Sequence, residues 1–228
     1  MATQNVLITG AGRGLGAAIA EAFGDNGAHV VICARSESEL TETAESVRQA
    51  GGTATVAVTD VRDEDQVFAA FADAVPGPLD IVVPAAGISP SPPGETALTR
   101  ESYENLDAAM ETNVRGLFAT LREGIQFMSD SGRVLVPSGK VAREPTENMG
   151  AYAASKAGAE GIARGFAADA EQAVGMVYPG MVATGLTGGR GRDPKSVSGL
   201  FVWAGTDCPA EELNGSVVDL RDWKAASN

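Results

Sequence analysis

Short, solidly apolar runs alternate along the chain with longer segments in which apolar residues recur every three or four positions. The short runs are typical of strands that are buried on both faces, as in a parallel sheet. The longer segments are typical of helices that bury one side. The pattern predicts seven strands, at residues 5–9, 28–34, 53–58, 79–83, 132–136, 174–178 and 216–220.

The predicted helices lie between these strands, and glycine or proline ends several of them. Residues 185–193 are rich in Gly and Arg and predict a flexible loop. Alternating strands and helices indicate a parallel sheet with helices on both faces. We therefore expect an α/β fold, a single doubly wound, Rossmann-type domain that spans residues 1–228. The predicted helices cover residues 17–23, 36–50, 63–75, much of 100–130, 152–173 and 194–205.

The turn after the first predicted strand is rich in glycine, with the sequence T-G-A-G-R-G-L-G at residues 9–16. Glycine lets the backbone turn tightly and approach a pyrophosphate, and the helix that follows offers free N–H groups and the positive end of its dipole. Strand, glycine turn and helix are the context that a dinucleotide site requires. Taken alone, the same residues also fit a plain glycine-rich turn.

Tyr152 and Lys156 are a candidate pair for acid–base catalysis. The segment 151–158 is rich in Ala and predicts a helix, so two side chains four residues apart share one face. A phenol has a pKa of about 10, and an ammonium close to it lowers that pKa by favouring the phenolate. Such a pair can exchange a proton near neutral pH. The alternative is a solvated helix face, and the surrounding motifs have to decide between the two.

Composition restricts the classes of function. The net charge of −13 and the pI of about 4.5 argue against binding to nucleic acid or anionic membranes. His29 is the one histidine, which argues against a zinc site or a Ser-His triad, so we expect no metal. No apolar run is long enough to span a membrane and no signal peptide is evident. Cys33 and Cys208 are expected to be reduced, in a cytoplasmic protein.

Several motifs occur together in an order and spacing that one protein family shares. They are T-G-A-G-R-G-L-G (9–16), Asp60-Val61, Ala85-Ala86-Gly87, Asn113, Ser138, Y-A-A-S-K (152–156) and P-G-M-V-A-T (179–184). With them the chain resembles the short-chain dehydrogenase/reductase family, of the classical type. The resemblance extends from Val6 to about Thr184 and more weakly to Leu220, and no single motif carries it.

The resemblance implies an oxidoreductase that uses a nicotinamide cofactor. Tyr152 would exchange a proton with the substrate oxygen. Lys156 would lower the pKa of Tyr152 and bind the nicotinamide ribose. Ser138 would hold the substrate oxygen, and Asn113 would position a water in a proton relay past Lys156. The implied catalytic residues are therefore Asn113, Ser138, Tyr152 and Lys156.

The resemblance also implies a set of cofactor contacts. Asp60 would recognise the adenine, and residues 179–184 would seat the nicotinamide. For three of the implied residues a purely structural role is the alternative. Ser138 could be a polar turn residue, Asn113 a structural helix residue, and Asp60 a cap or turn residue. The complete implied set is Gly10, Arg13, Gly14, Leu15, Gly16, Arg35, Asp60, Val61, Ala85, Ala86, Gly87, Tyr152, Lys156, Pro179, Gly180, Val182 and Thr184.

The end of the second predicted strand bears on the choice of cofactor. NAD usually needs an acidic residue there for its ribose 2′-hydroxyl, but this chain has Ala34 followed by Arg35. A guanidinium suits a 2′-phosphate, and Arg13 could add a second contact. We therefore expect NADP(H) rather than NAD(H). The alternative is that both arginines are solvated and NAD(H) is used.

Two segments depart from the family pattern. Residues 84–87 are Pro-Ala-Ala-Gly where the family commonly has Asn-Asn-Ala-Gly, and the two missing amides usually brace the central strands and the cofactor. Weaker cofactor binding is therefore expected. The stretch 185–193 is short where longer relatives form a helical lid, so the site is expected to be open or closed by a neighbouring subunit.

The expected function is the NADP(H)-dependent interconversion of a carbonyl and an alcohol on a small or medium substrate. One alternative is a nucleotide-sensing or regulatory binding protein without turnover, and another is a non-redox use of bound cofactor. We expect no nucleic-acid or membrane partner. The small residues at 157–165 predict that this helix packs closely against a copy of itself, in a homodimer or homotetramer.

Overall fold

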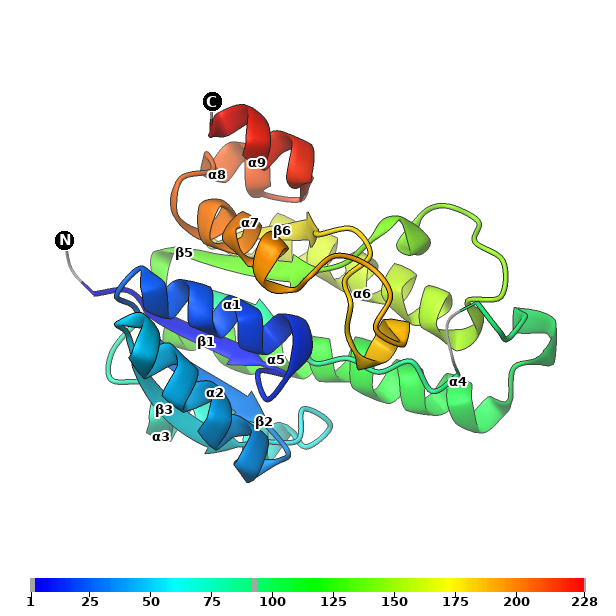
Figure 1. Cartoon of the computed structure of the whole chain (residues 1–228), viewed down its shortest axis with the longest axis horizontal. Coiled ribbons are helices and arrows are strands. Elements are labelled where there is room, and N and C mark those ends of the chain that lie inside the picture. Colours follow the sequence, from blue (N-terminus) through cyan, green and yellow to red (C-terminus); the bar gives the residue numbers. More distant parts are fainter. Residues whose placement is uncertain (1–2, 92–93, 228) are drawn as a thin grey trace.

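The computed structural model describes residues 3–91 and 94–227, and among these a seven-stranded sheet forms the centre (Figure 1). The strands lie in the order β3-β2-β1-β4-β5-β6-β7, and every neighbouring pair is parallel. The predicted fold class is confirmed. The strands are β1 (Asn5–Thr9), β2 (His29–Ala34), β3 (Thr53–Val58), β4 (Leu79–Pro84), β5 (Met128–Pro137), β6 (Ala173–Tyr178) and β7 (Val217–Asp219).

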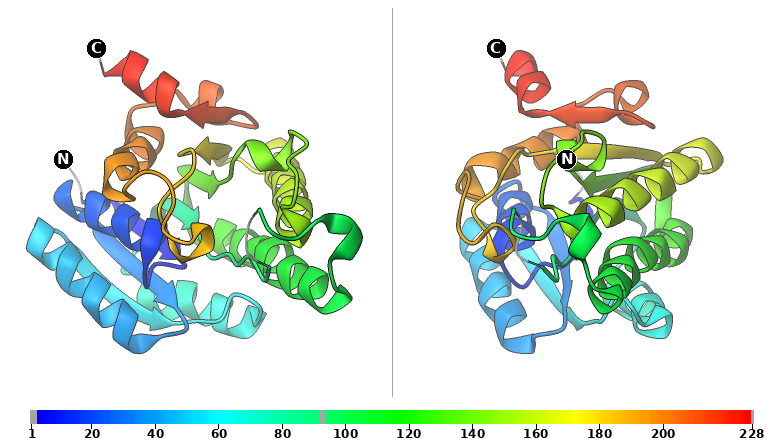
Figure 2. Two further views of the ribbon diagram at one scale, coloured as in Figure 1. Left: turned by 45° about the vertical axis from the view of Figure 1, so that its right-hand side comes forward. Right: turned by 90° about the vertical axis from the view of Figure 1, so that its right-hand side faces the viewer.

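Two layers of helices cover the sheet, as the right-hand view of Figure 2 shows. One face carries α1 (Gly14–Asp25), α2 (Glu37–Ala50) and α7 (Lys195–Thr206), and the other carries α3 (Glu64–Ala74), α5 (Gly116–Gly124) and α6 (Gly150–Asp169). Helix α4 (Tyr103–Met110) leads through a π-helical turn, Glu111–Arg115, into α5 and lies against α6. Two short helices, α8 (Ala210–Leu213) and α9 (Leu220–Ala226), flank β7.

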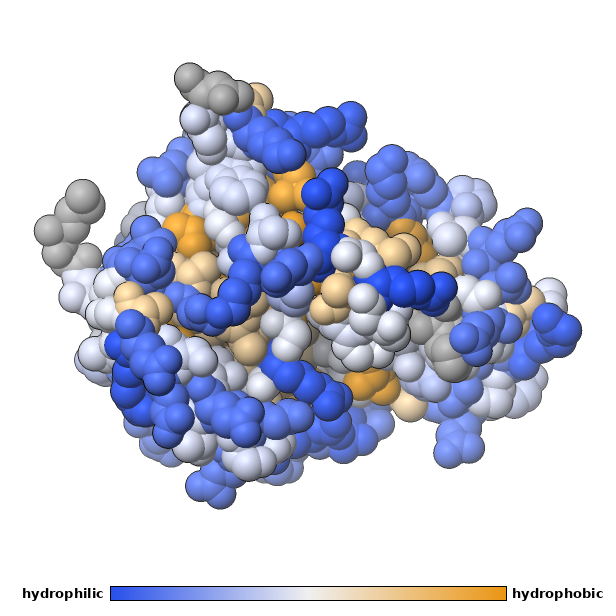
Figure 3. Space-filling view, in the orientation of Figure 1, coloured by the Kyte–Doolittle hydropathy of each residue, from blue (hydrophilic) through white to orange (hydrophobic). Residues whose placement is uncertain are grey.

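The central strands β1 and β4 are mostly apolar because both faces of the sheet are buried there. In β1, Val6 and Ile8 pack on the α1 and α2 side, whereas Leu7 packs on the α3 and α5 side. β2 follows the same pattern, but β3 lies at the sheet edge and is only partly buried. The molecular surface seen in Figure 3 is mainly hydrophilic, with small, separate apolar areas. In the described part of the chain, no helix combines the length and apolarity needed to cross a bilayer.

Some boundaries differ from the prediction. β5 begins at Met128, inside the segment predicted as helical, because Met128 pairs with Leu79 of β4. α6 ends at Asp169, earlier than predicted. The apolar pattern does not predict α9, although Asp219 caps its first turn. Short apolar runs suit either a helix or a strand, and pairing with distant residues decides between them.

The glycine turn after β1 is packed against the start of α1. Gly10 has a φ of +69°, a conformation that residues with a side chain rarely adopt. A Cβ atom on Gly16 would overlap the carbonyl oxygen of Gly10. Helix α1 therefore approaches the turn as closely as glycine alone allows, and the two form one packed unit at the carboxyl end of β1.

Replacing Gly16 by Ala is expected to destabilise the protein by about 1–3 kcal/mol, the usual cost of forcing an extra carbon into a packed site. The matched control is Gly77→Ala in the loop before β4, because a Cβ atom there would lie 3.6 Å from Asn5 Nδ2, an ordinary contact, and Gly77 has no positive φ. The control should change the stability by no more than about 1 kcal/mol. Urea unfolding at a fixed protein concentration measures both, and equal stabilities of the two variants would contradict the packing argument.

Candidate active site

The loops after β1 and β4 meet at the carboxyl edge of the sheet, at the point where the strand order reverses. A Cβ atom on Gly10 would lie 2.6 Å from the Cα atom of Ala86, so the loops are in contact. The Ala85 N–H donates to the carbonyl oxygen of Thr9 (3.1 Å). Pro84, which pairs with Thr9, ends β4. We call Pro84, Ala85 and Ala86 the crevice floor.

The start of α1 fits the phosphates of a dinucleotide. Arg13, which precedes the helix, makes no side-chain hydrogen bond to its first N–H groups, and no acidic residue lies in the first turn. Gly14 has a φ of +60°, and a Cβ atom there would lie 3.2 Å from Thr184 Cγ2. Pyrophosphate binding requires uncapped N–H groups at the positive end of a helix dipole, on a backbone without bulky side chains. A nicotinamide dinucleotide therefore fits the residues present.

Arg35 and Asp60 follow β2 and β3, on the side of the switch point that would take the adenosine half of a dinucleotide. The pKa of Asp60 is lowered, mainly by hydrogen bonds from the Arg62 guanidinium (Nη2–Oδ2 2.6 Å) and less by the charge of Arg35. Arg13 lies 3.4 Å from Glu39. Asp60 and Arg13 are thus paired within the protein, whereas exposed Arg35 forms no ion pair with the described residues.

Two residues of the implied cofactor set pack into the core. Val61 is 6% exposed and contacts Gly116 of α5. Leu15 packs against the core on the α1 side. Val61 can therefore offer a ligand little beyond its backbone groups, whereas the side chain of Leu15 remains partly exposed.

Asn113 is buried in the π-helical turn, a kind of helix distortion that is frequent at functional sites. Its amide donates to the carbonyl oxygen of Ile88 (2.8 Å) and to Ser155 Oγ (2.9 Å), and accepts from the Ile88 N–H (2.8 Å). Ser155 in turn donates to the carbonyl oxygen of Tyr152 (2.8 Å). Both amide protons of Asn113 are therefore used, and toward a water its side chain could offer only the second lone pair of Oδ1.

Glu101 holds the first turn of α6. Its carboxylate accepts from the Ala151 N–H (2.9 Å) and from the side chains of Ser91 (2.8 Å) and Asn105 (3.0 Å). Gly150, where the helix starts, has a φ of +48°, and a Cβ atom there would overlap this carboxylate. The hydrogen bonds of Glu101 thus fix the entry into the helix that carries the candidate phenol.

Tyr152 and Lys156 lie one turn apart on α6, and Lys156 reaches the end of β5. Lys156 Nζ donates to the carbonyl oxygen of Pro137 (2.7 Å). Burial lowers the pKa of Lys156 to about 8, while the charge of Glu160 acts in the opposite direction. The Tyr152 hydroxyl makes no hydrogen bond to a described residue, and burial raises its pKa. The sequence predicts a lower pKa from the charge of Lys156, but in this structure the pKa of Tyr152 shifts the other way, and burial is the cause.

Ser138 directly follows β5, and its hydroxyl donates to Glu160 Oε1 (2.8 Å). Glu160 is the functional candidate that sequence reasoning missed. Its spacing could have indicated it, because Glu160 lies on α6 one turn after Lys156 and two turns after Tyr152, on the same face. Hydrogen bonds thus link Ser138, through Glu160, to the helix of Tyr152.

The segment after β6 completes the edge. Gly180 has a φ of +77°, and Val182 is buried and pairs with Arg192. Thr187 Oγ1 donates to the carbonyl oxygen of Val182 (2.7 Å). Residues 185–193, predicted as a flexible loop, are therefore hydrogen-bonded into a compact turn. The four implied nicotinamide contacts in this segment are Pro179, Gly180, Val182 and Thr184.

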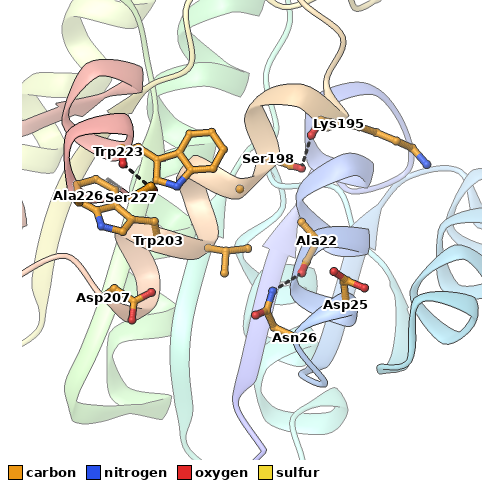
Figure 4. Close-up of a pocket in the computed structure, with 12 residues that line it drawn as sticks. Ala22, Asp25, Asn26, Lys195, Ser198, Trp203, Asp207, Trp223, Ala226 and Ser227 are labelled. Carbon is orange, nitrogen blue, oxygen red and sulfur yellow. Dashed lines mark hydrogen bonds between the residues drawn. The ribbon is translucent and has the colours of Figure 1, made fainter.

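A separate hollow of about 680 Å³ lies between α1, α7 and α9 (Figure 4). Trp203 and Trp223 line it, and Asn26 there donates to the carbonyl oxygen of Ala22 (2.9 Å). Ala22 and Asn26 lie at the opposite end of α1 from the glycine turn. The hollow is therefore not part of the candidate active site.

Residues 4–195 match the profile of the family described as short chain dehydrogenase. This match covers most of the chain, so the protein belongs to the short-chain dehydrogenase/reductase family. It is an NAD(P)-dependent oxidoreductase. The predicted family and enzyme class are confirmed.

Named relatives agree with this class. The 3beta-hydroxysteroid dehydrogenase 1 of Eggerthella lenta is 33% identical over 202 residues, which cover 85% of this chain and 76% of the relative. Versicolorin reductase 1 of Aspergillus parasiticus is 33% identical over 187 residues, 79% of this chain and 70% of the relative. A 3-oxoacyl-(acyl-carrier protein) reductase with bound NAD from Brucella melitensis is 28% identical with a TM-score of 0.81, covering 95% of this chain and 89% of that chain.

Replacing Glu101 by Gln is expected to lower the free energy of unfolding at pH 7 by about 0.5–1 kcal/mol, because the amide loses the charge that favours a helix start. Hydrogen bonds lower the pKa of Glu101 from its ordinary 4.5, and the one from the Ala151 N–H has the largest effect. The stabilisation is therefore complete above pH 4.5 and is lost as the pH falls through the lowered pKa. Urea unfolding across this range measures the difference.

The matched control is Glu95→Gln. Glu95 is exposed and forms no hydrogen bond or ion pair within the described part of the chain. The Glu95→Gln variant should show neither the loss of unfolding free energy at pH 7 nor its dependence on pH. A loss for Glu101→Gln that persists unchanged at low pH would show that the charge of Glu101 is not its cause.

Proposed function

We propose that the protein is an NADP(H)-dependent oxidoreductase that interconverts a carbonyl and an alcohol on a small or medium substrate, with Tyr152 as general acid and base. One observation carries the proposal. Lys156, one turn after Tyr152, lies with Nζ 2.7 Å from the carbonyl oxygen of Pro137, immediately before Ser138. The relatives named above, a hydroxysteroid dehydrogenase and two reductases, support the same reaction class.

Each residue of the site has a defined task in this proposal. Hydride chemistry is supplied by the nicotinamide cofactor when it is bound. Tyr152 gives its hydroxyl proton to the substrate oxygen in reduction and takes it back in oxidation. Lys156, charged below its pKa of about 8, favours the phenolate and orients the ribose. Ser138 holds the substrate oxygen, and Asn113 supports the loop at Ile88 and the turn of Tyr152 through Ser155.

The preference for NADP(H) is supported by Arg35. Its guanidinium is exposed after β2 and is charged at all relevant pH values. Arg13 can add a contact, because an exposed pair of 3.4 Å with Glu39 contributes little and opens readily. The remaining contacts of the proposed set come from the backbone of the glycine turn, residues 85–87 and residues 179–184.

We also propose that the protein forms a homodimer or homotetramer through α5 and α6, in a reducing, cytoplasmic setting. Phe118 is 44% exposed and stacks edge to face on Phe166 of α6, with 6.0 Å between ring centroids. A Cβ atom on Gly161 would meet open space, so a copy of this face can approach closely. Cys33 and Cys208 are both buried and free. Sedimentation equilibrium reports the assembly, and a monomer would exclude it.

Replacing Tyr152 by Phe is expected to lower kcat at least about 100-fold, the usual contribution of a positioned general acid. The substrate comes from a screen of NADPH oxidation over aldehydes, ketones, quinones and keto esters. The control is Tyr103→Phe, because Tyr103 is 87% exposed. Undiminished turnover in Tyr152→Phe would refute the mechanism. Binding of NADPH without turnover of any carbonyl would favour a regulatory binding protein instead.

Replacing Arg35 by Asp is expected to raise KM for NADPH at least about tenfold and to leave KM for NADH unchanged or lower, since a carboxylate repels a 2′-phosphate and accepts a bond from a 2′-hydroxyl. The control is Arg221→Asp, an exposed arginine of α9 paired with Asp219. Steady-state kinetics with both cofactors measure the change. A wild-type preference for NADH that Arg35→Asp does not alter would contradict the assignment.

A further inference from the structure

Arg62 and Asp60 form a bidentate ion pair in the turn after β3. The Arg62 guanidinium donates from Nε to both carboxylate oxygens of Asp60 (3.0 and 3.1 Å) and from Nη2 to Oδ2 (2.6 Å). The backbone N–H of Arg62 adds a hydrogen bond to Oδ1 (3.0 Å). A pair with two parallel contacts fixes the orientation of both groups. Asp60 is therefore held in place by a residue outside the implied cofactor set.

Neighbouring elements hold the turn and the guanidinium in this arrangement. The Asp60 N–H donates to Gln66 Oε1 of α3 (3.0 Å), and Arg115 Nη1 of the π-helical turn donates to the carbonyl oxygen of Arg62. The Nε and Nη2 atoms of Arg62 are bonded to Asp60, while its Nη1 lies 4.0 Å from Glu111 Oε2. Arg62 is thus anchored at its backbone and at both ends of its guanidinium.

Arg35 is the neighbour of this pair at the sheet edge. The Thr59 N–H donates to the carbonyl oxygen of Ala34 (2.9 Å), so the next residues of the two chains, Arg35 and Asp60, leave the paired strands β2 and β3 together. The charge of Arg35 acts on Asp60 and helps to lower its pKa, although less than the bonds from Arg62 do. Exposed Arg35 itself forms no ion pair with the described residues. The carboxylate beside it belongs to Arg62.

An unpaired Asp60 would oppose a 2′-phosphate at Arg35 in two ways. Its negative charge would repel the phosphate, and it would attract the Arg35 guanidinium away from the phosphate. The pair with Arg62 neutralises the carboxylate and keeps it from turning toward Arg35. A carboxylate has about four acceptor sites and Arg62 fills three of them with separate N–H groups, so one remains for the amino group of an adenine.

We propose that Arg62 is a positioning residue for cofactor selection, which holds Asp60 in a neutralised pair and so leaves Arg35 to the 2′-phosphate of NADP(H). The inference rests on the proposed function, which assigns the 2′-phosphate to Arg35. Selection between the two cofactors then depends on a residue that acts through Asp60 and need not touch the cofactor.

The test compares two ligands that differ only in the 2′-phosphate, adenosine 2′,5′-bisphosphate and adenosine 5′-monophosphate. Calorimetric titration of each into the whole protein gives two dissociation constants, and the ratio of the bisphosphate constant to the monophosphate constant reports how well the 2′-phosphate is held. In Arg62→Gln the ratio should rise about fivefold, the effect of a strong exposed ion pair, because the released Asp60 competes with the phosphate for Arg35. A purely structural loss would weaken both ligands alike and leave the ratio unchanged.

Two further comparisons show whether the effect acts through Asp60. In an Asp60→Asn background, Arg62→Gln should leave the ratio within about twofold, because no carboxylate remains to compete, whereas a direct attraction between Arg62 and the phosphate would persist. The matched control is Arg221→Gln. Arg221 bonds to Asp219 with the same spacing (Nε–Oδ2 3.3 Å), but β7 lies at the opposite edge of the sheet from β3, so the ratio should not change.

An unchanged or lower ratio in Arg62→Gln overturns the inference, and so does an equal rise in the Asp60→Asn background. Thermal unfolding shows whether each variant is folded, and if Arg62→Gln is not, Arg62→Met, which is uncharged and unbranched, decides in its place by the same criterion. A wild-type ratio of one or more overturns only the preference for NADP(H) in the proposed function, because the change that Arg62→Gln causes remains measurable.

Discussion

Two hydrogen bonds attach helix α6 to the carboxyl end of β5, and the geometry of the candidate site depends on them. Lys156 donates to the carbonyl oxygen of Pro137, and Glu160 accepts from Ser138. Two side chains one turn apart on a helix thus hold two consecutive residues of the sheet edge. Tyr152 lies one turn earlier on the same face, so its position over the edge follows from this attachment.

The fold could be predicted where the causes of structure are local. Ser36 and Asp63 accept N–H bonds at the starts of α2 and α3, as such residues do at N-caps. The short apolar runs predict strands that are buried on both faces of the sheet. The start of β5 could not be predicted, because it depends on Leu79, which is far away in the sequence.

The candidate site could be predicted by residue type and spacing, but its internal pairings could not. Nothing in the local sequence indicates that Glu160 of α6 accepts a hydrogen bond from Ser138 at the end of β5. The same holds for the hydrogen bonds that the Asn113 amide donates to Ile88 and Ser155. Arg62 and Asp60 are two residues apart, but their hydrogen bonds depend on the geometry of the turn after β3, which the sequence does not reveal. Partners are set by tertiary packing, which periodicity does not encode.

The crevice floor has a consequence for the thermodynamics of cofactor binding. Pro84, Ala85 and Ala86 carry no side-chain amide, so their side chains can give a cofactor no hydrogen bonds. However, alanine and proline have almost no side-chain rotamers to immobilise, so a ligand that settles on them incurs no loss of side-chain entropy. The two effects oppose each other: fewer hydrogen bonds are available to hold the ligand, but the side chains that it meets need no ordering.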